Sequence, residues 1–199
     1  MALILGFDTS AAHCAAALLD GDTLLESCAE EMSRGQAERL MGLLEELLAR
    51  HAKTWADLDA IGVGIGPGNF TGIRISVSAA RGLALALPRA PAIGISTFEA
   101  IAVDTHPSDT SGKIPAVPAP RDQLYVAQSG RTPVLLPRSE AEGLGPLALP
   151  PVAAQLAENI ARAAAVKHAT GSAWSAPAPL YIRAADAAPP RDPAPHILP

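Results

Sequence analysis

A glycine-rich stretch, GIGPGNFTGIRIS from Gly64 to Ser76, has the residue types of an anion-binding loop. Between a strand and a helix, such a turn presents free backbone N–H groups at the positive end of the helix dipole, and these groups bind phosphate. The stretch lacks the lysine of a GxxxxGK[ST] loop and does not keep the GxGxxG spacing ahead of an acidic residue. The alternative is structural, because glycines let the chain turn and let a helix approach the sheet closely. The spacing favours this structural interpretation.

Asp8 follows the first apolar stretch, where an aspartate can orient a nucleotide-bound metal ion. At the same position an aspartate can form an Asx turn or cap a helix, and these alternatives stay open. No second acidic partner is recognisable in a matching loop, so Asp8 does not by itself indicate a kinase. The candidate residues for a vestigial nucleotide or anion site are Asp8, Thr9, Gly66 and Gly68.

Neither Ser10 nor Ser96 lies in a GxSxG motif, so no serine nucleophile is recognisable. The two cysteines, Cys14 and Cys28, form neither a CxxC pair nor a disulfide framework, which is typical of a reduced, cytoplasmic setting. We therefore predict no catalytic residue in this chain.

Apolar periodicity predicts the elements that would position these residues. Residues 36–51 are predicted to form an amphipathic helix, because Leu40, Leu43, Leu44, Leu47 and Leu48 fall on one face. A second helix is predicted over residues 73–87, ended by Pro88, with many small residues on one side. The other expected elements are strands at 3–7, 14–19, 24–27, 60–65, 92–95, 124–127 and 134–136, helices at 97–103 and 152–166, and an edge segment at 180–183. This order predicts an α/β protein.

The composition changes after about His106, where prolines multiply. We place a boundary near Thr97 and expect a first lobe over 1–97 and a smaller lobe, rich in Pro and Ala, over 98–199. The tail from Pro189 is expected to be irregular.

The chain has 15 Lys and Arg and 20 Asp and Glu, which give a formal net charge of −5. Because the net charge is negative and the basic residues are scattered, we do not expect the chain to bind nucleic acid without a partner. The start, MALILGFDTS, resembles neither a signal peptide nor a membrane span. No membrane association is expected.

Four strings together resemble the TsaB family, also called YeaZ: ILGFDTS, GVGIGPGNFTGIRISVSAARGLALAL, GISTFEA and PLYIRAADA. The resemblance is close over residues 1–102 and patchy beyond. Where family members carry a DARRGEVY-like string, this chain has PAPRDQLYVAQ from Pro118 and keeps only Arg121, Leu124 and Tyr125 of the pattern.

The resemblance implies the actin/Hsp70/sugar-kinase fold, with two lobes of mixed β-sheet flanked by helices and a reduced second lobe. It implies a non-catalytic subunit that binds TsaD for the synthesis of N6-threonylcarbamoyladenosine in tRNA, with the ATPase TsaE in a larger complex and tRNA bound only through that complex. Self-association without the partner is also implied. No cofactor is expected, although ATP binding is left open. The alternative function is a self-sufficient ATP-binding phosphotransferase or ATPase of the same fold.

TsaD-like proteins bind a metal through two histidines one helical turn apart, whereas no two of the five histidines here are four residues apart. We therefore expect no metal. The resemblance places the partner interface on the two helices, and Leu43 or Leu47 is expected to leave apolar surface there, although leucine stripes are usually core. The expected interface residues are Arg39, Leu43, Leu47, Ile73, Arg74, Val77, Ser78 and Arg81.

Overall fold

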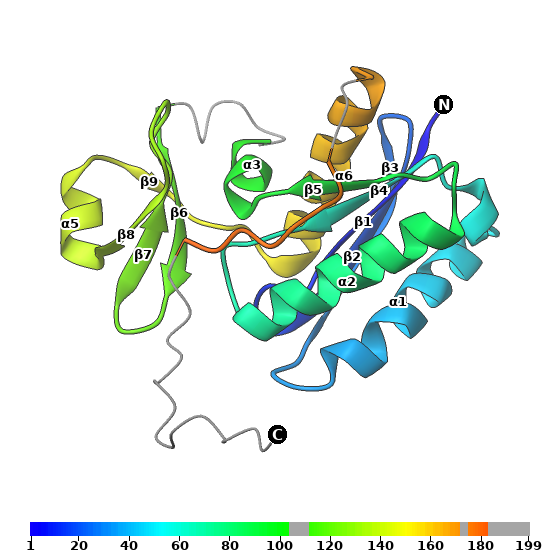
Figure 1. Cartoon of the computed structure of the whole chain (residues 1–199), viewed down its shortest axis with the longest axis horizontal. Coiled ribbons are helices and arrows are strands. Elements are labelled where there is room, and N and C mark those ends of the chain that lie inside the picture. The colour runs from blue at the N-terminus through cyan, green and yellow to red at the C-terminus, as the bar shows by residue number, and fades with distance from the viewer. Residues whose placement is uncertain (104–111, 172–174, 183–199) are drawn as a thin grey trace, which may run out of the picture.

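The computed structural model describes residues 1–103, 112–171 and 175–182, and it contains two β-sheets flanked by helices (Figure 1). The larger sheet has the order β3-β2-β1-β4-β5. Its first three strands form an antiparallel meander, and β4 and β5 join it in parallel. The bounds are β1 Leu3–Asp8, β2 His13–Asp20, β3 Thr23–Glu31, β4 Ala60–Gly64 and β5 Ala92–Ile95.

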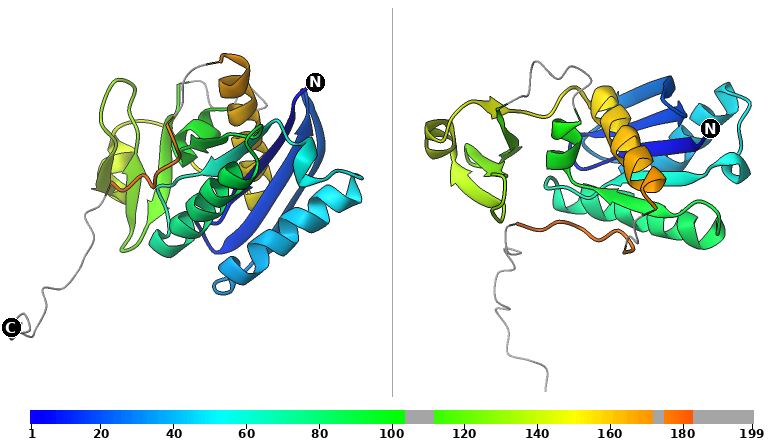
Figure 2. Two further views of the ribbon diagram at one scale, coloured as in Figure 1. Left: turned by 45° about the vertical axis from the view of Figure 1, so that its right-hand side comes forward. Right: turned by 90° about the horizontal axis from the view of Figure 1, so that it is seen from above.

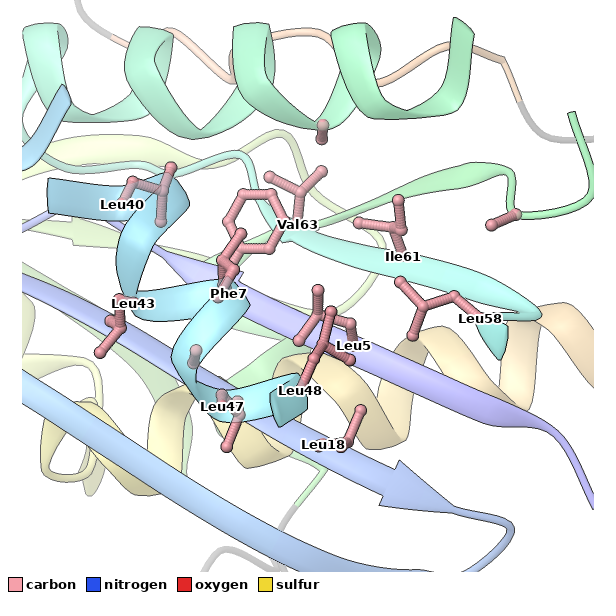
Figure 3. Packing of buried hydrophobic residues seen from close by; sticks show 14 of the residues in the cluster. Leu5, Phe7, Leu18, Leu40, Leu43, Leu47, Leu48, Leu58, Ile61 and Val63 are labelled. Atoms are coloured by element: carbon pink, nitrogen blue, oxygen red, sulfur yellow. The ribbon is translucent and has the colours of Figure 1, made fainter. Parts of the chain in front are cut away.

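Strand β1 is buried along its whole length because helices cover both faces of the sheet. Successive side chains of a strand point to opposite faces. Leu5 and Phe7 pack with the leucines of α1 (Gln36–Arg50) in one core cluster (Figure 3), whereas Ile4 packs with α6 (Ala153–Ala169) in the other. Helix α2 (Phe70–Ala86) lies beside α1 on the first face, as Figures 1 and 2 show.

Helix α6 packs closely on the sheet because it presents alanines to glycines. A Cβ atom added at Gly6 would lie 2.6 Å from the Cβ of Ala161, and one added at Gly62 would lie 2.7 Å from that of Ala164. The alanine-rich composition of α6 and the glycines of β1 and β4 therefore match each other.

The predicted leucine stripe of α1 lies entirely in the core. Leu43 is 3% exposed and Leu47 is 0% exposed, so the expectation that they leave apolar surface is wrong. Both side chains pack in the buried cluster that contains Leu5 and Phe7, because β2 and β3 extend the sheet beneath the whole helix.

The smaller sheet has the order β8-β7-β6-β9 and lies beside the larger one (Figure 2). Its strands are β6 Ile114–Ala119, β7 Gln123–Val126, β8 Val134–Pro137 and β9 Leu147–Ala148. The short helices are α3 Thr97–Ala102, α5 Arg138–Gly143 and a 3₁₀ turn at Trp55–Asp57. No described helix is long and apolar enough to span a bilayer.

The architecture confirms the predicted fold class of two mixed sheets flanked by helices. The division into 1–97 and 98–199 stays a prediction, and α6, from the second range, packs on the larger sheet. The expected edge segment is an irregular chain over 180–182, where the amide of Leu180 donates to the carbonyl of Ile65 at 2.8 Å. Arg183 and the expected irregular tail lie outside the described residues.

Candidate functional site

The glycine-rich loop packs directly on the turn between β1 and β2. The amide of Asn69 donates to the carbonyl of Ser10 at 2.6 Å, and the hydroxyl of Thr9 donates to the carbonyl of Gly72 at 2.7 Å. A Cβ atom at Gly68 would overlap the carbonyl oxygen of Ser10, and one at Gly72 would overlap that of Thr9. These glycines therefore permit a close approach of two backbone segments.

The start of α2 is capped from within the loop. The side-chain oxygen of Asn69 accepts a hydrogen bond from the amide of Gly72 at 2.8 Å. Gly66 has a φ of +91°, a conformation that favours glycine, and its carbonyl accepts from the amide of Thr97 at 2.8 Å. The amides of Asn69 and Gly72, which could bind an anion, are thus already bonded within the protein.

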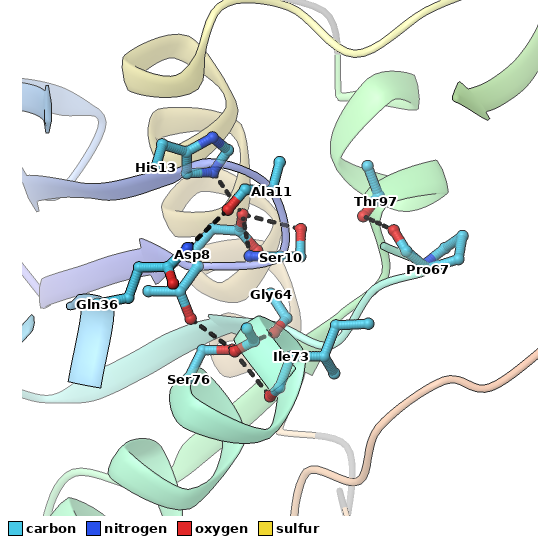
Figure 4. A network of polar contacts seen from close by, with 12 residues as sticks. Asp8, Ser10, Ala11, His13, Gln36, Gly64, Pro67, Ile73, Ser76 and Thr97 are labelled. Atoms are coloured by element: carbon cyan, nitrogen blue, oxygen red, sulfur yellow. Dashed lines mark hydrogen bonds and ion pairs between the residues drawn. The ribbon is translucent and has the colours of Figure 1, made fainter. Parts of the chain in front are cut away.

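Asp8 is fully buried at the centre of this contact (Figure 4). Its Oδ2 accepts from the amide and the hydroxyl of Ser10, both at 2.9 Å, and from Nε2 of His13 at 2.7 Å. Its Oδ1 has no hydrogen-bond partner among the described residues and lies against Gly64, where an added Cβ would overlap it. Asp8 is therefore held as an internal acceptor.

Sequence reasoning missed the partnership of Asp8 with His13. The two residues flank the tight turn between β1 and β2, and that antiparallel turn was the signal that could have predicted their contact. The assignment of Asp8, Thr9, Gly66 and Gly68 to a nucleotide or anion site stays a prediction.

Arg39 forms a charge cluster within its own chain. Its Nε donates to Glu30 at 2.8 Å and its Nη1 donates to Glu46 at 2.7 Å. Hydrogen bonds from Arg39 hold the pKa values of both carboxyl groups below their usual range. The expected interface role of Arg39 stays a prediction, and its charge is already paired on the surface of α1 and β3.

Helices α1 and α2 border a surface groove of about 380 Å³. Arg74 and Ser78, both expected at the interface, are exposed and line this groove. Ile73 and Val77 point the other way and are only 1% and 4% exposed. Arg81 is exposed one turn beyond Ser78. The groove is lined by Ala37, Leu40, Met41, Thr71, Arg74, Ile75, Ser78 and Ala79.

The outward side of α2 carries a stripe of small and apolar residues. The stripe consists of Thr71, Ile75, Ser78, Gly82 and Leu85, at alternating spacings of four and three residues. Leu85 is 86% exposed, and a Cβ at Gly82 would meet no atom within 4 Å. Such a stripe can receive another helix at short distance.

Arg74 also links α2 to Tyr181, in the segment 175–182. Its guanidinium carbon lies 3.7 Å from the centre of the Phe70 ring, and its Nε donates to the hydroxyl of Tyr181 at 2.8 Å. The rings of Phe70 and Tyr181 lie 5.1 Å apart. One side chain therefore connects the groove to the segment that joins the two sheets.

We expect Arg74→Ala to speed hydrogen exchange of the Leu180 amide about tenfold, because a cation–π contact and a hydrogen bond are lost together. Exchange measured by NMR checks this result. Arg81→Ala, an exposed position on the same helix, is the control and should leave the rate unchanged. Equal rates in wild type and Arg74→Ala would show that Arg74 does not hold the segment.

Among the described residues, no group of three or more His, Cys, Asp and Glu side chains is arranged to hold a metal ion. The groups that the structure brings together are thus the closed turn around Asp8 and the open groove between α1 and α2.

Comparisons with known proteins agree with this architecture. The family model described as TsaD, tRNA N6-adenosine threonylcarbamoyltransferase, matches residues 28–142. The tRNA threonylcarbamoyladenosine biosynthesis protein TsaB of Escherichia coli K12 is 30% identical over 132 residues, which are 64% of this chain and 55% of that protein. The TsaB protein of Haemophilus influenzae is 30% identical over 135 residues, 66% of this chain and 55% of that protein. The chain spans about half the length of these curated relatives.

The solved structure of YeaZ from Pseudomonas aeruginosa matches with a TM-score of 0.73 and 27% identity, over 91% of this chain and 100% of that one. The names of the two TsaB relatives describe them as biosynthesis proteins for threonylcarbamoyladenosine in tRNA, whereas the description of the family model is that of a transferase.

Proposed function

This chain belongs to the TsaB (YeaZ) proteins within the family that the TsaD model describes, and from that premise we propose that it is a non-catalytic subunit that binds TsaD. In this role it supports the synthesis of N6-threonylcarbamoyladenosine in tRNA, next to the anticodon. It contributes a surface and a fixed shape to the transferase, and the chemistry takes place on the partner.

The observation that carries this proposal is the unused outer face of α2. Leu85 is 86% exposed and Met41, across the groove, is 37% exposed, although the core of the same lobe is closed. A groove between two helices, lined by small and apolar side chains, fits a helix of a partner protein. Arg74 and Arg81 add positive charge along the outer side of α2, where acidic residues of the partner would lie.

The contacts of the glycine-rich loop support a role in which this chain catalyses no reaction. Asp8 Oδ2 already accepts three hydrogen bonds, and the loop backbone lies against Thr9 and Ser10. A metal-bound triphosphate at this turn would have to displace the loop. We propose accordingly that the chain works without a cofactor, and that the alternative, an ATP-dependent phosphotransferase or ATPase, is not its function.

The remaining partners follow from the same proposal. TsaE would join a larger complex, and tRNA would be bound only through that complex, because the chain carries a net charge of −5. Without TsaD the same helix face would pair two copies of this chain. The proposed location is the cytoplasm, where tRNA is modified.

The molar mass of the species that form when this chain is mixed with TsaD from the same organism tests the proposal. Light scattering on the mixture should give a species with one copy of each chain at micromolar concentrations. Two separate species in the mixture would contradict the proposal. ATP hydrolysis by the purified chain that is lost in Asp8→Asn would favour the alternative function.

A further inference from the structure

A cavity of about 1000 Å³ lies between the two sheets, at the upper end of the volumes found for small-molecule sites. It is bordered by the turn after β1, the start of α2, strands β6 and β7, and residues 180–182, which cross from the larger sheet to the smaller one (Figure 1). The pairing proposed above uses the other side of α2, so the cavity has no role in it.

The walls of this cavity are apolar and aromatic. Ile73, Val117 and Leu156 line its interior, and the rings of Phe70, Tyr125 and Tyr181 also face it. None of the described residues that line it is Lys, Arg, Asp or Glu. A polyphosphate would lose its hydration here without gaining a cationic partner, so the lining favours an uncharged ligand with flat rings.

One buried polar group gives the cavity a fixed anchor. His13 lines it, is 8% exposed, and bonds through Nε2 to Asp8 Oδ2 at 2.7 Å. In the tautomer whose Nε2 donates to this carboxylate, Nδ1 of the imidazole is a hydrogen-bond acceptor. Within the described part of the chain, the hydrogen bond of the His13 ring is the one through Nε2, and the ring borders the cavity. Nδ1 is therefore free to accept one from a ligand.

From the apolar walls, the lack of charge and the anchored imidazole, we propose that this cavity binds an uncharged small molecule with flat rings and one N–H or O–H donor. The rings lie among Phe70, Tyr125 and Tyr181, and the donor bonds to Nδ1 of His13. Asp8 orients this imidazole through Oδ2, which also accepts from the amide and the hydroxyl of Ser10.

Two dyes that differ by one charge test the proposal on the full chain. N-phenyl-1-naphthylamine is uncharged, carries aromatic rings and has one N–H donor, whereas 1-anilinonaphthalene-8-sulfonate adds a sulfonate to the same skeleton. Fluorescence titration should give saturable binding of one uncharged dye per chain and about tenfold weaker binding of the sulfonate. Non-saturable binding, or equal affinity for the two dyes, would overturn the proposal.

A bulky side chain at the rim locates the site. Ala11 is exposed and lines the cavity, so Ala11→Trp should weaken binding of the uncharged dye about tenfold or more. Ala49→Trp, on the exposed side of α1 and outside the cavity, is the matched control and should bind as wild type does. If circular dichroism shows that Ala11→Trp does not fold, Ala153→Trp, at another lining position, takes its place. Unchanged affinity in a folded cavity variant would overturn the proposal.

The anchor is tested separately with 1-benzylnaphthalene, which has similar rings and no N–H group. It should displace the uncharged dye with about fivefold weaker affinity, the value of one neutral hydrogen bond. Equal affinity of the two compounds would refute the role of His13.

Discussion

Gly72→Ala is expected to destabilise the protein by about 3 kcal/mol, because its Cβ would overlap the carbonyl oxygen of Thr9. That oxygen belongs to a fully buried residue, and the hydroxyl of Thr9 bonds back to the carbonyl of Gly72 at 2.7 Å. Neither backbone segment can yield without breaking the contacts around Asp8. The large effect follows from the close approach of the two loops.

Gly82→Ala, three turns further along the same helix, is the matched control. An added Cβ there meets no atom within 4 Å, so the higher helix propensity of alanine should stabilise the protein by up to about 1 kcal/mol. Urea unfolding followed by far-UV circular dichroism gives both values. If the two variants have similar stabilities, the loop is not held against Thr9 and is open to an anion.

Met41→Glu and Ser78→Glu are expected to weaken binding to TsaD by about a hundredfold each, since each carboxylate would be buried in an apolar contact without a partner. Both residues line the groove and are exposed in the free chain, so the fold should survive. Leu43 and Val77 are unsuitable for this purpose, because they are 3% and 4% exposed and a charge there would unfold the lobe.

Isothermal titration with TsaD measures the loss, and unfolding midpoints confirm that the variants stay folded. Ser139→Glu places the same charge on the exposed side of α5, far from the groove in sequence and fold, and should bind as wild type does. Wild-type affinity in both groove variants would show that TsaD does not bind at α1 and α2.

Much of the larger sheet could be predicted because its signals are local. The leucine spacing of α1 and the apolar stretch before Gly64 fixed their element types from neighbouring residues alone. The return of α6 to the larger sheet could not be predicted. It depends on the match of Ala161 and Ala164 to Gly6 and Gly62, which are about 100 to 155 residues away along the chain.

The residue types at the candidate site could be predicted from the sequence, whereas the orientation of each side chain could not. Periodicity separated Val77 from Ser78 on α2, but the expected interface included Ile73 and Val77, which are buried, together with the exposed Ser78. The structural interpretation of Gly68 and Gly72 agrees with their contacts to Ser10 and Thr9. The cavity depends on residues from both sheets, so no single stretch of sequence could indicate it.

Reconstituted tRNA modification tests the proposed role most directly. Mass spectrometry would measure N6-threonylcarbamoyladenosine in tRNA incubated with the threonylcarbamoyl donor, TsaE and ATP, and with this chain, TsaD or both. A non-catalytic subunit should give product only when both proteins are present, and the Met41→Glu variant should reduce it strongly. Product formed by this chain without TsaD, or an equal yield from TsaD without this chain, would contradict the proposed function.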